Sequence, residues 1–196
     1  MTQDAADDGR VRCDWIDQSR LAPADFILYR DYHDTEWGRP LRDSTALFER
    51  VSLEAFQSGL SWLIILRKRE NFRRAFHRFD IDKVARYTDR DIERLLNDTG
   101  IVRNRAKIEA TIANARAVAD LDVDLGELLW SFAPQARSRP VSMTDVPAVT
   151  PESTAMAKEL KRRGFRFVGP TTAYALMQAT GMVDDHVASC WVPATA

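Results

Sequence analysis

Apolar residues recur at helical spacing along most of this 196-residue chain, and capping residues and glycines divide the pattern into short segments. No segment alternates apolar and polar residues convincingly over six positions, so we expect no β-sheet. The chain is predicted to be all-α, with seven to nine short helices. The clearest are expected over residues 44–59, about 61 to 72, 88–100, about 105–118, 150–164 and about 171–181.

Composition limits the class of protein. A hydrophobic content of 45% is enough for a core, and the length fits one domain with a long loop over residues 134–147. No run of about 18 apolar residues predicts a membrane span, so no membrane partner is expected. The N-terminal MTQDAADDGR lacks the basic and apolar regions of a secretory signal, which predicts a cytoplasmic protein. Two cysteines are too few for a disulfide scaffold.

The formal net charge of −1 differs from the strongly basic balance of most nucleic-acid binders. Any contact with DNA must therefore come from a local patch or from backbone amides. Two basic stretches qualify, RNRAK at 103–107 and KELKRRGFRF at 158–167.

The few cysteines and histidines suggest a metal site. Cys13 and His33 lie near one end of the chain, and His186 and Cys190 near the other. Two thiolates and two imidazoles are the ligands that tetrahedral zinc prefers, and four protein ligands would make the site structural. On a helix, His186 and Cys190 would share one face. The alternative is that the cysteines are buried thiols and the histidines ordinary polar side chains.

The segment around Gly164 and Gly169 is similar to a helix-hairpin-helix. One helix ends at Gly164, a short turn follows, and a second helix begins near Thr171. Backbone amides at such a helix N-terminus can face a DNA phosphate. The alternative is a structural connection between two helices.

Glu54 is predicted to lie on the apolar face of its helix, with Leu47 and Val51. A buried carboxylate is costly unless it is paired, hydrogen-bonded or functional. A Glu–Arg pair is one alternative and a binding site is the other. Five aromatic residues, Trp15, Tyr29, Tyr32, Trp37 and Trp62, lie within 48 residues around it, although aromatics more often belong to the core.

Eight segments in order carry a family resemblance. They are RCDW, YRDYHDTEWG, LFERVSLEAFQSGLSW, KRENFRRAFHRFD, TGIVRNRAKIEATIANARA, WSF, KRRGFRFVG and VDDHVASC. From about Arg12 to Cys190 the chain resembles the DNA-3-methyladenine glycosylase I family of the helix-hairpin-helix superfamily. The resemblance implies a monofunctional base-excision-repair enzyme that flips 3-methyladenine out of duplex DNA and leaves the free base and an abasic site.

The resemblance also implies one structural Zn²⁺ per chain, bound by Cys13, His33, His186 and Cys190. The implied organisation is a single glycosylase domain over residues 11–192. Its zinc-containing part is formed by about 11–40 and 180–192. Residues 1–10 are expected to be a disordered tail and residues 193–196 a second tail. A monomer is expected.

By the same resemblance, Glu54 reads the base edge and is a candidate catalytic residue, while Tyr32 and Trp62 stack on the base. Trp15, Tyr29 and Trp37 are candidates for the pocket wall. A cationic base favours such aromatic faces and a carboxylate. The DNA backbone is expected at the hairpin residues Arg163, Gly164, Phe165, Gly169 and Thr171.

Two positions refine the expected mechanism. Bifunctional members of the superfamily carry a Schiff-base lysine where this chain has Thr171, which implies no strand cleavage. Asp184 stands where many superfamily members have a catalytic aspartate. It either stabilises the transition state or caps the last helix beside His186, and we favour the cap.

Three other functions stay open. A non-enzymatic DNA-binding hairpin module would need no inward Glu54, and a zinc hydrolase would need an open coordination position. A glycosylase of shifted specificity would accept 3-methylguanine or 7-methylguanine.

Overall fold

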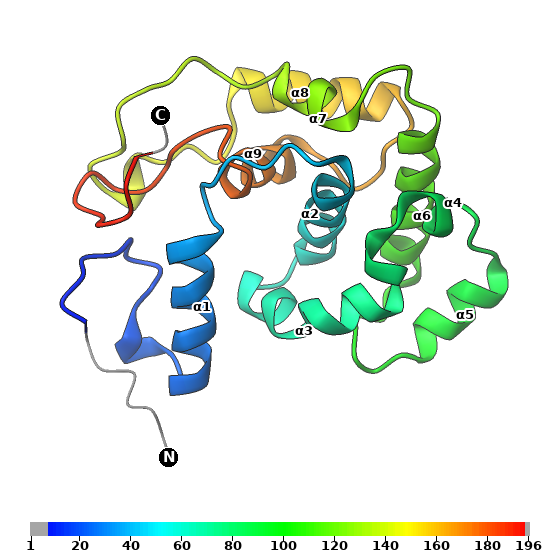
Figure 1. Cartoon of the computed structure of the whole chain (residues 1–196), viewed down its shortest axis with the longest axis horizontal. Coiled ribbons are helices and arrows are strands. Elements are labelled where there is room, and N and C mark those ends of the chain that lie inside the picture. Colours follow the sequence, from blue (N-terminus) through cyan, green and yellow to red (C-terminus); the bar gives the residue numbers. More distant parts are fainter. Residues whose placement is uncertain (1–7, 195–196) are drawn as a thin grey trace.

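The computed structural model describes residues 8–194 of the chain, which form nine α-helices, three short 3₁₀ turns and no β-strand. The predicted all-α fold is therefore confirmed. Figure 1 shows the helices. They are α1 (Pro23–Thr35), α2 (Ser44–Gln57), α3 (Trp62–Ala75), α4 (Ile81–Ala85), α5 (Asp89–Asn97), α6 (Arg105–Ala119), α7 (Leu125–Trp130), α8 (Pro151–Arg162) and α9 (Pro170–Ala179). The 3₁₀ turns are η1 (Gln18–Arg20), η2 (His77–Phe79) and η3 (Met143–Asp145).

Helix α2 is the centre of the fold. It contacts α3, α6, α7 and α9, so side chains on almost every face of its second half are buried. Either Asp43 or Ser44 could cap this helix from the sequence, and Asp43 is the cap, because its carboxylate accepts a hydrogen bond from the Ala46 N–H at 2.8 Å. The helix ends at Gln57, and Gly59 takes a left-handed φ of +79° in the turn to α3.

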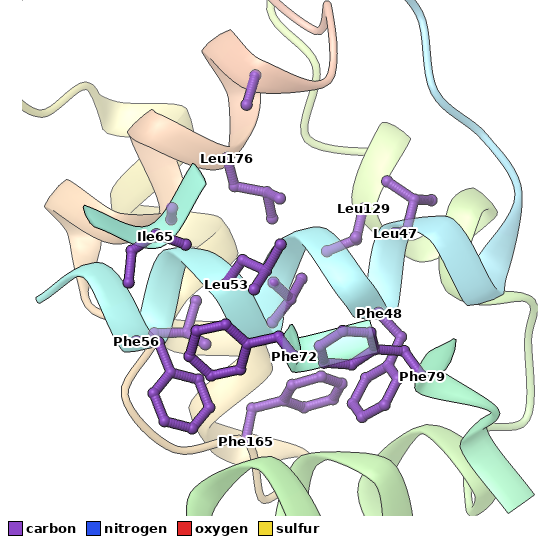
Figure 2. Close-up of a cluster of buried hydrophobic side chains, with 14 of the residues drawn as sticks. Leu47, Phe48, Leu53, Phe56, Ile65, Phe72, Phe79, Leu129, Phe165 and Leu176 are labelled. Carbon is purple, nitrogen blue, oxygen red and sulfur yellow. The ribbon is translucent and has the colours of Figure 1, made fainter. Parts of the chain in front are cut away.

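Aromatic packing holds the far side of α2 (Figure 2). Phe48 and Phe56 of α2 contact Phe72 of α3, Phe76 just after α3 and Phe79 of η2, and all five are fully buried. Burying a side chain of this size stabilises a fold by about 1.5–3 kcal/mol. The cluster packs against the face of α2 that carries Phe48 and Phe56, whereas Glu54 lies on the face that lines the candidate site.

The predicted boundaries agree with the structure where capping chemistry is local. Thr88 forms its capping box with Asp91, and Thr150 caps α8 with Pro151 in the first turn. Three helices, α1, α4 and α7, were not predicted. In α1 the buried face carries the polar His33 as well as Phe26 and Tyr32, which weakens the amphipathic pattern.

The two end segments of the described chain lie together beside α1 (Figure 1). The Trp191 N–H donates to the Val11 carbonyl at 2.9 Å, and the Arg10 guanidinium lies 3.9 Å above the Trp191 ring. Of the predicted N-terminal tail over 1–10, residues 1–7 lie outside the described residues. Of the predicted C-terminal tail over 193–196, residues 195 and 196 lie outside them. In the part of the chain that is described, no helix is both long and apolar enough to cross a membrane.

Candidate active site and metal site

A cavity of about 200 Å³ opens between α1, α2 and α9. All six predicted base-binding residues line it, contributed by three different helices and two loops. The full lining is Trp15, Tyr29, Tyr32, Trp37, Glu54, Gln57, Trp62, Met143, Ala175 and Gln178.

Glu54 is the buried carboxyl of this cavity. Its side chain is 5% exposed, and within residues 8–194 no group hydrogen-bonds to it or forms a salt bridge with it. Burial raises its pKa to about 7, and the positive charge of Arg50 opposes that shift only in part. A side chain of this kind can change its protonation state near neutral pH and can bind a cation.

The alternative of a buried Glu54–Arg pair is wrong. Arg50, one turn earlier on α2, donates to the Tyr32 hydroxyl at 3.1 Å and lies 3.6 Å from the Glu36 carboxylate. Its guanidinium is therefore held behind the aromatic wall. The oxygen atoms of Glu54 therefore remain available to a ligand in the cavity.

The aromatic side chains form a continuous wall. Tyr32 and Trp62 are in contact, with ring centroids 5.4 Å apart and a 43° tilt, and Trp15 meets Tyr29 edge-on at 5.1 Å. Because the rings of Tyr32 and Trp62 are in direct contact, they leave no slot for a planar ligand between them.

Trp62 has a further property. Its indole Nε1 is buried and has no hydrogen-bond partner within the described residues. Such orphan donors are uncommon in folded proteins, and they are often found where a ligand or water completes the site. The orphan therefore fits a cavity built for a polar, planar ligand.

The metal-ligand candidates meet in one buried cluster next to this wall. Atoms of Cys13, His33, His186 and Cys190 all lie within 4.8 Å of one another. The Cys190 Sγ lies 3.5 Å from His186 Nδ1 and 3.6 Å from His33 Nε2, and Cys13 Sγ lies 3.7 Å from His186 Nδ1. Tetrahedral zinc with Zn–S of about 2.3 Å and Zn–N of about 2.0 Å places sulfur and nitrogen ligands about 3.5 Å apart. The donor set and its spacing fit such an ion.

Hydrogen bonds fix which ring nitrogen each histidine presents. His33 Nδ1 lies 2.8 Å from the Asp34 carboxylate, which leaves Nε2 for the cluster. His186 Nε2 lies 3.2 Å from the Trp37 carbonyl oxygen, which leaves Nδ1. Asp34 is held in turn by Arg12 at 2.7 Å. Partners of this kind orient metal-binding imidazoles in proteins.

The segment that carries His186 and Cys190 is a turn, so the prediction that they share a helix face is wrong. The Cys190 N–H donates to the Val187 carbonyl at 2.8 Å, and α9 has already ended at Ala179. A turn brings side chains four residues apart together as effectively as a helix does.

Asp184 lies outside the aromatic cavity and lines a different one. One carboxylate oxygen accepts from the His186 N–H at 3.3 Å, and the other accepts from Arg139 Nε at 2.8 Å. Asp184 therefore caps the turn before His186. The expected cap on the last helix is wrong in one respect, because no helix follows Asp184 in the described residues.

The hairpin turn joins α8 to α9, which pack against each other. Gly164 has a φ of +93°, a conformation that glycine adopts without strain. Gly169 and Thr171 are exposed, and their backbone N–H groups have no partner among residues 8–194. They are therefore open to an anion.

Other predicted DNA contacts are not open in this way. Phe165 is 4% exposed and its N–H donates to the Leu160 carbonyl, so it packs the turn and cannot reach a phosphate. The Gly164 N–H donates to the Lys161 carbonyl. The Arg163 guanidinium forms salt bridges with Asp122 and Glu159, both at 2.7 Å.

The basic stretch 103–107 is also partly occupied. Lys107 is buried and donates to the carbonyls of Phe56 at 2.9 Å and Ser58 at 2.5 Å. It thereby caps the C-terminal end of α2. Arg105 pairs with Glu93. The positive charges of Lys107 and Arg105 are therefore bound by groups of the protein itself and are less available to DNA.

Four cavity residues were not predicted. Gln57 follows Glu54 by three positions, so helical spacing alone places it on a neighbouring face. Ala175 and Gln178 share a similar spacing on α9. Met143 comes from the long loop, and nothing in the sequence pattern identifies it.

Known protein sequences match this chain over most of its length. The profile of the methyladenine glycosylase family matches residues 24–193. DNA-3-methyladenine glycosylase 1 of Escherichia coli (strain K12) is 45% identical over 185 residues, which cover 91% of this chain and 95% of the relative. DNA-3-methyladenine glycosylase of Haemophilus influenzae is 43% identical over 186 residues, which cover 92% and 96%.

Solved structures are similar over the same range. The crystal structure of a 3-methyladenine DNA glycosylase I superposes with a TM-score of 0.86 at 46% identity, covering 92% of this chain and 98% of the other. The Staphylococcus aureus enzyme gives 0.83 at 36% identity, covering 86% and 93%. A Tyr-to-Phe variant of 3-methyladenine DNA glycosylase I, in complex with 3-methyladenine, gives 0.82 at 35% identity, covering 89% and 95%.

Proposed function

The chain belongs to the methyladenine glycosylase family, and from that premise we propose that it is a base-excision-repair DNA glycosylase that removes 3-methyladenine from alkylated DNA. The enzyme hydrolyses the N-glycosidic bond and leaves an abasic site. A relative at 35% identity has been solved with 3-methyladenine bound, which supports the choice of base. The observation that carries the proposal is Glu54, a buried carboxyl without a partner among the described residues, in a cavity walled by aromatic rings.

The chemistry of the substrate fits this cavity. Methylation at N3 makes the adenine cationic and a good leaving group, so the reaction needs little acid catalysis. The C1′–N9 bond breaks with its electron pair going to the base, and water adds to C1′ and loses a proton. The enzyme must flip the nucleotide out and hold its base.

We assign the holding of the base to the predicted residues. The base stacks on the wall formed by Tyr32 and Trp62, and the ionised Glu54 faces its edge. Trp15 and Tyr29, which meet edge-on, limit the size of the base. A cation over aromatic faces contributes about 0.5–2 kcal/mol, and the carboxylate adds a charge-assisted hydrogen bond.

We propose that duplex DNA is bound through a helix-hairpin-helix formed by α8, the glycine turn and α9. The amides of Gly169 and Thr171 would face a phosphate at the N-terminal end of α9. Gln178, on the same helix, lines the cavity about 10 Å further along the axis. One helix would then connect the backbone contact with the flipped base.

Thr171 supports a monofunctional reaction. An amine at this position would be needed for a Schiff base with C1′, and a hydroxyl cannot form one. Abasic DNA should therefore stay unbroken until heat or alkali is applied. Nicked product formed by the enzyme alone would contradict this assignment.

We propose that Zn²⁺ is the ion of the Cys13, His33, His186 and Cys190 cluster. When bound, it acts as a structural cross-link between the two ends of the domain, because four protein ligands leave no position for water. The tautomers held by Asp34 and by the Trp37 carbonyl support this assignment. The expected stoichiometry is one zinc per chain, measured by atomic absorption on the purified protein.

We also propose a domain organisation, an oligomeric state and a location for the protein. Residues 11–192 act as one glycosylase domain, with the zinc-containing part built from about 11–40 and 180–192. The protein works as a monomer on duplex DNA, and a cytoplasmic location agrees with a substrate in DNA.

The decisive test is base release from duplex DNA treated with a methylating agent. The free bases are separated by chromatography, and we expect 3-methyladenine to be the dominant product. Glu54→Gln serves as the matched variant, because it removes the charge and keeps the volume. If the folded, zinc-loaded protein binds methylated DNA but releases no base, a non-enzymatic DNA-binding module becomes the better function.

A further inference from the structure

Gln178 lines the cavity, and its side-chain amide is held by a hydrogen bond. Its Nε2 donates to the Asp185 carboxylate at 3.0 Å. Asp185 has no exposed side-chain surface and accepts two further hydrogen bonds, from the Tyr174 hydroxyl at 2.6 Å and from Arg137 at 2.7 Å. Three donors therefore hold this carboxylate in one position.

The carboxylate determines which way the Gln178 amide faces. An ionised carboxylate only accepts hydrogen bonds, so the amide must present its NH₂ group to Asp185. The amide oxygen Oε1 is then directed away from Asp185 and has no partner within residues 8–194. Because Gln178 lines the cavity, this oxygen is a fixed acceptor available to a ligand.

Adenine and guanine differ in the group that would meet such an acceptor. Adenine carries an exocyclic amine at C6, which donates, whereas guanine carries a carbonyl oxygen there, which only accepts. A fixed acceptor stabilises the first and repels the second. An unpaired polar group in a buried site is the kind of penalty that gives enzymes strong discrimination.

We propose that Gln178 determines specificity by accepting a hydrogen bond from the amine of 3-methyladenine, and that Asp185 is the positioning residue that keeps the amide from turning over. This inference rests on the proposed glycosylase function. It identifies Gln178 as the residue that excludes 3-methylguanine, a base of similar charge and size.

Glu54 alone is poorly suited to this discrimination. Its pKa of about 7 means that a substantial fraction is protonated at neutral pH. A protonated carboxyl has an O–H donor and could hydrogen-bond to the guanine oxygen. The Gln178 amide does not titrate, and its NH₂ group is held by a buried carboxylate that accepts hydrogen bonds from three donors.

The test compares the two methylated bases in duplex DNA. The ratio of kcat/KM for 3-methyladenine release to that for 3-methylguanine release is measured for wild type, Gln178→Met and Asp185→Asn. Gln178→Met keeps an unbranched side chain of similar size, and we expect it to lower the ratio roughly tenfold. Asp185→Asn should also lower the ratio, because an asparagine can offer its own NH₂ and let the Gln178 amide turn over.

Tyr174→Phe is the matched control. It removes one hydrogen bond to the same carboxylate and leaves the Gln178 contact in place. The ratio should stay within about twofold of wild type, even if thermal stability falls. A fall in the ratio for Tyr174→Phe equal to that for Gln178→Met would overturn the specific role of Gln178.

Other outcomes separate this inference from the proposed function. If Gln178→Met and Asp185→Asn slow both reactions by the same factor, the network is only structural and the inference fails while the glycosylase function stands. If the wild type releases neither base, the proposed function itself fails. Should one variant not fold, the ratio for the other decides, because the two act on opposite ends of one hydrogen bond.

Discussion

Trp37 packs its indole ring edge-on against the imidazole of His186, with ring centroids 4.7 Å apart, and its carbonyl oxygen lies 3.2 Å from His186 Nε2. Trp37 also lines the aromatic cavity, so a single residue joins the candidate metal site to the candidate base site. Trp15 makes a second connection, because its ring lies 5.1 Å from that of His33. The metal cluster therefore supports the wall against which a base would stack.

Loss of the metal should disturb the cavity as well as the fold. In Cys190→Ser we expect the zinc content to fall from one per chain toward zero and the free energy of unfolding to fall by at least about 2 kcal/mol. The intrinsic fluorescence of Trp15 and Trp37 should change in the folded protein. His77→Gln is the control, because His77 lies outside the cluster and should leave the zinc content unchanged. Full zinc content in Cys190→Ser would contradict the ligand assignment.

Glu54→Gln should make the protein more stable at alkaline pH and much less active. The Glu54 pKa is raised from 4.5 to about 7, so the folded state binds the proton more tightly than the unfolded state does. Stability linked to Glu54 is therefore complete below about pH 4.5 and is lost as pH rises through 7, a loss of about 3 kcal/mol. The glutamine variant avoids this loss. Denaturant unfolding of both proteins at pH 5 and pH 8 measures the loss. If the free energies of unfolding of wild type and variant differ by the same amount at both pH values, this would argue against a buried, unpaired Glu54.

The activity of the wild type should depend on the same proton. In the proposed function the substrate base is cationic throughout this pH range, so we expect its binding to require the ionised Glu54. We expect kcat/KM for 3-methyladenine release to fall about tenfold per pH unit below about 7, since this parameter reports ionisations of the free enzyme. The Glu54→Gln enzyme should show a low and flat profile between pH 5.5 and 8. A wild-type profile without an inflection near 7 would remove Glu54 from this role.

Asp184→Asn should have a modest effect on base release. Asp184 caps the turn before His186 and pairs with Arg139, and it does not line the aromatic cavity. Asparagine can still accept from the His186 N–H, so we expect the single-turnover rate to change by less than about tenfold, or about 1.4 kcal/mol. A loss of a hundredfold or more, with zinc content and folding unchanged, would identify Asp184 as catalytic.

Gly38→Ala tests how closely the two sites are packed. Gly38 has a φ of +75°, and a Cβ atom there would lie 3.1 Å from His186 Nε2. We expect a loss of stability of about 1–3 kcal/mol and weaker retention of zinc, measured by thermal unfolding and by competition with a chelator. Gly59→Ala is the matched control, because Gly59 also has a positive φ but a Cβ there meets nothing within 4 Å. Equal zinc retention in both variants would show that Gly38 matters only for its backbone.

Sequence reasoning is reliable here where an interaction is local. The caps at Asp43, Thr88 and Thr150 and the glycine turns at Gly59 and Gly164 all depend on residues within a few positions of one another. Their chemistry can be read from the chain without knowing what lies across the core. Helix α1 was missed because its buried face serves the cavity and the metal cluster, which mixes polar residues into the pattern.

The all-α class, the approximate bounds of six helices, a rare set of two cysteines and two histidines, and an inward-facing Glu54 could be predicted from the amino-acid sequence. Long-range packing shows that Glu54 has no ion-pair partner within the described residues, and that Gln178 lines the same cavity with its amide held by Asp185. It also replaced the expected helix at His186 and Cys190 with a turn. Caps and periodicity come from short-range geometry, whereas the partner of a buried polar group depends on which distant segments pack against it.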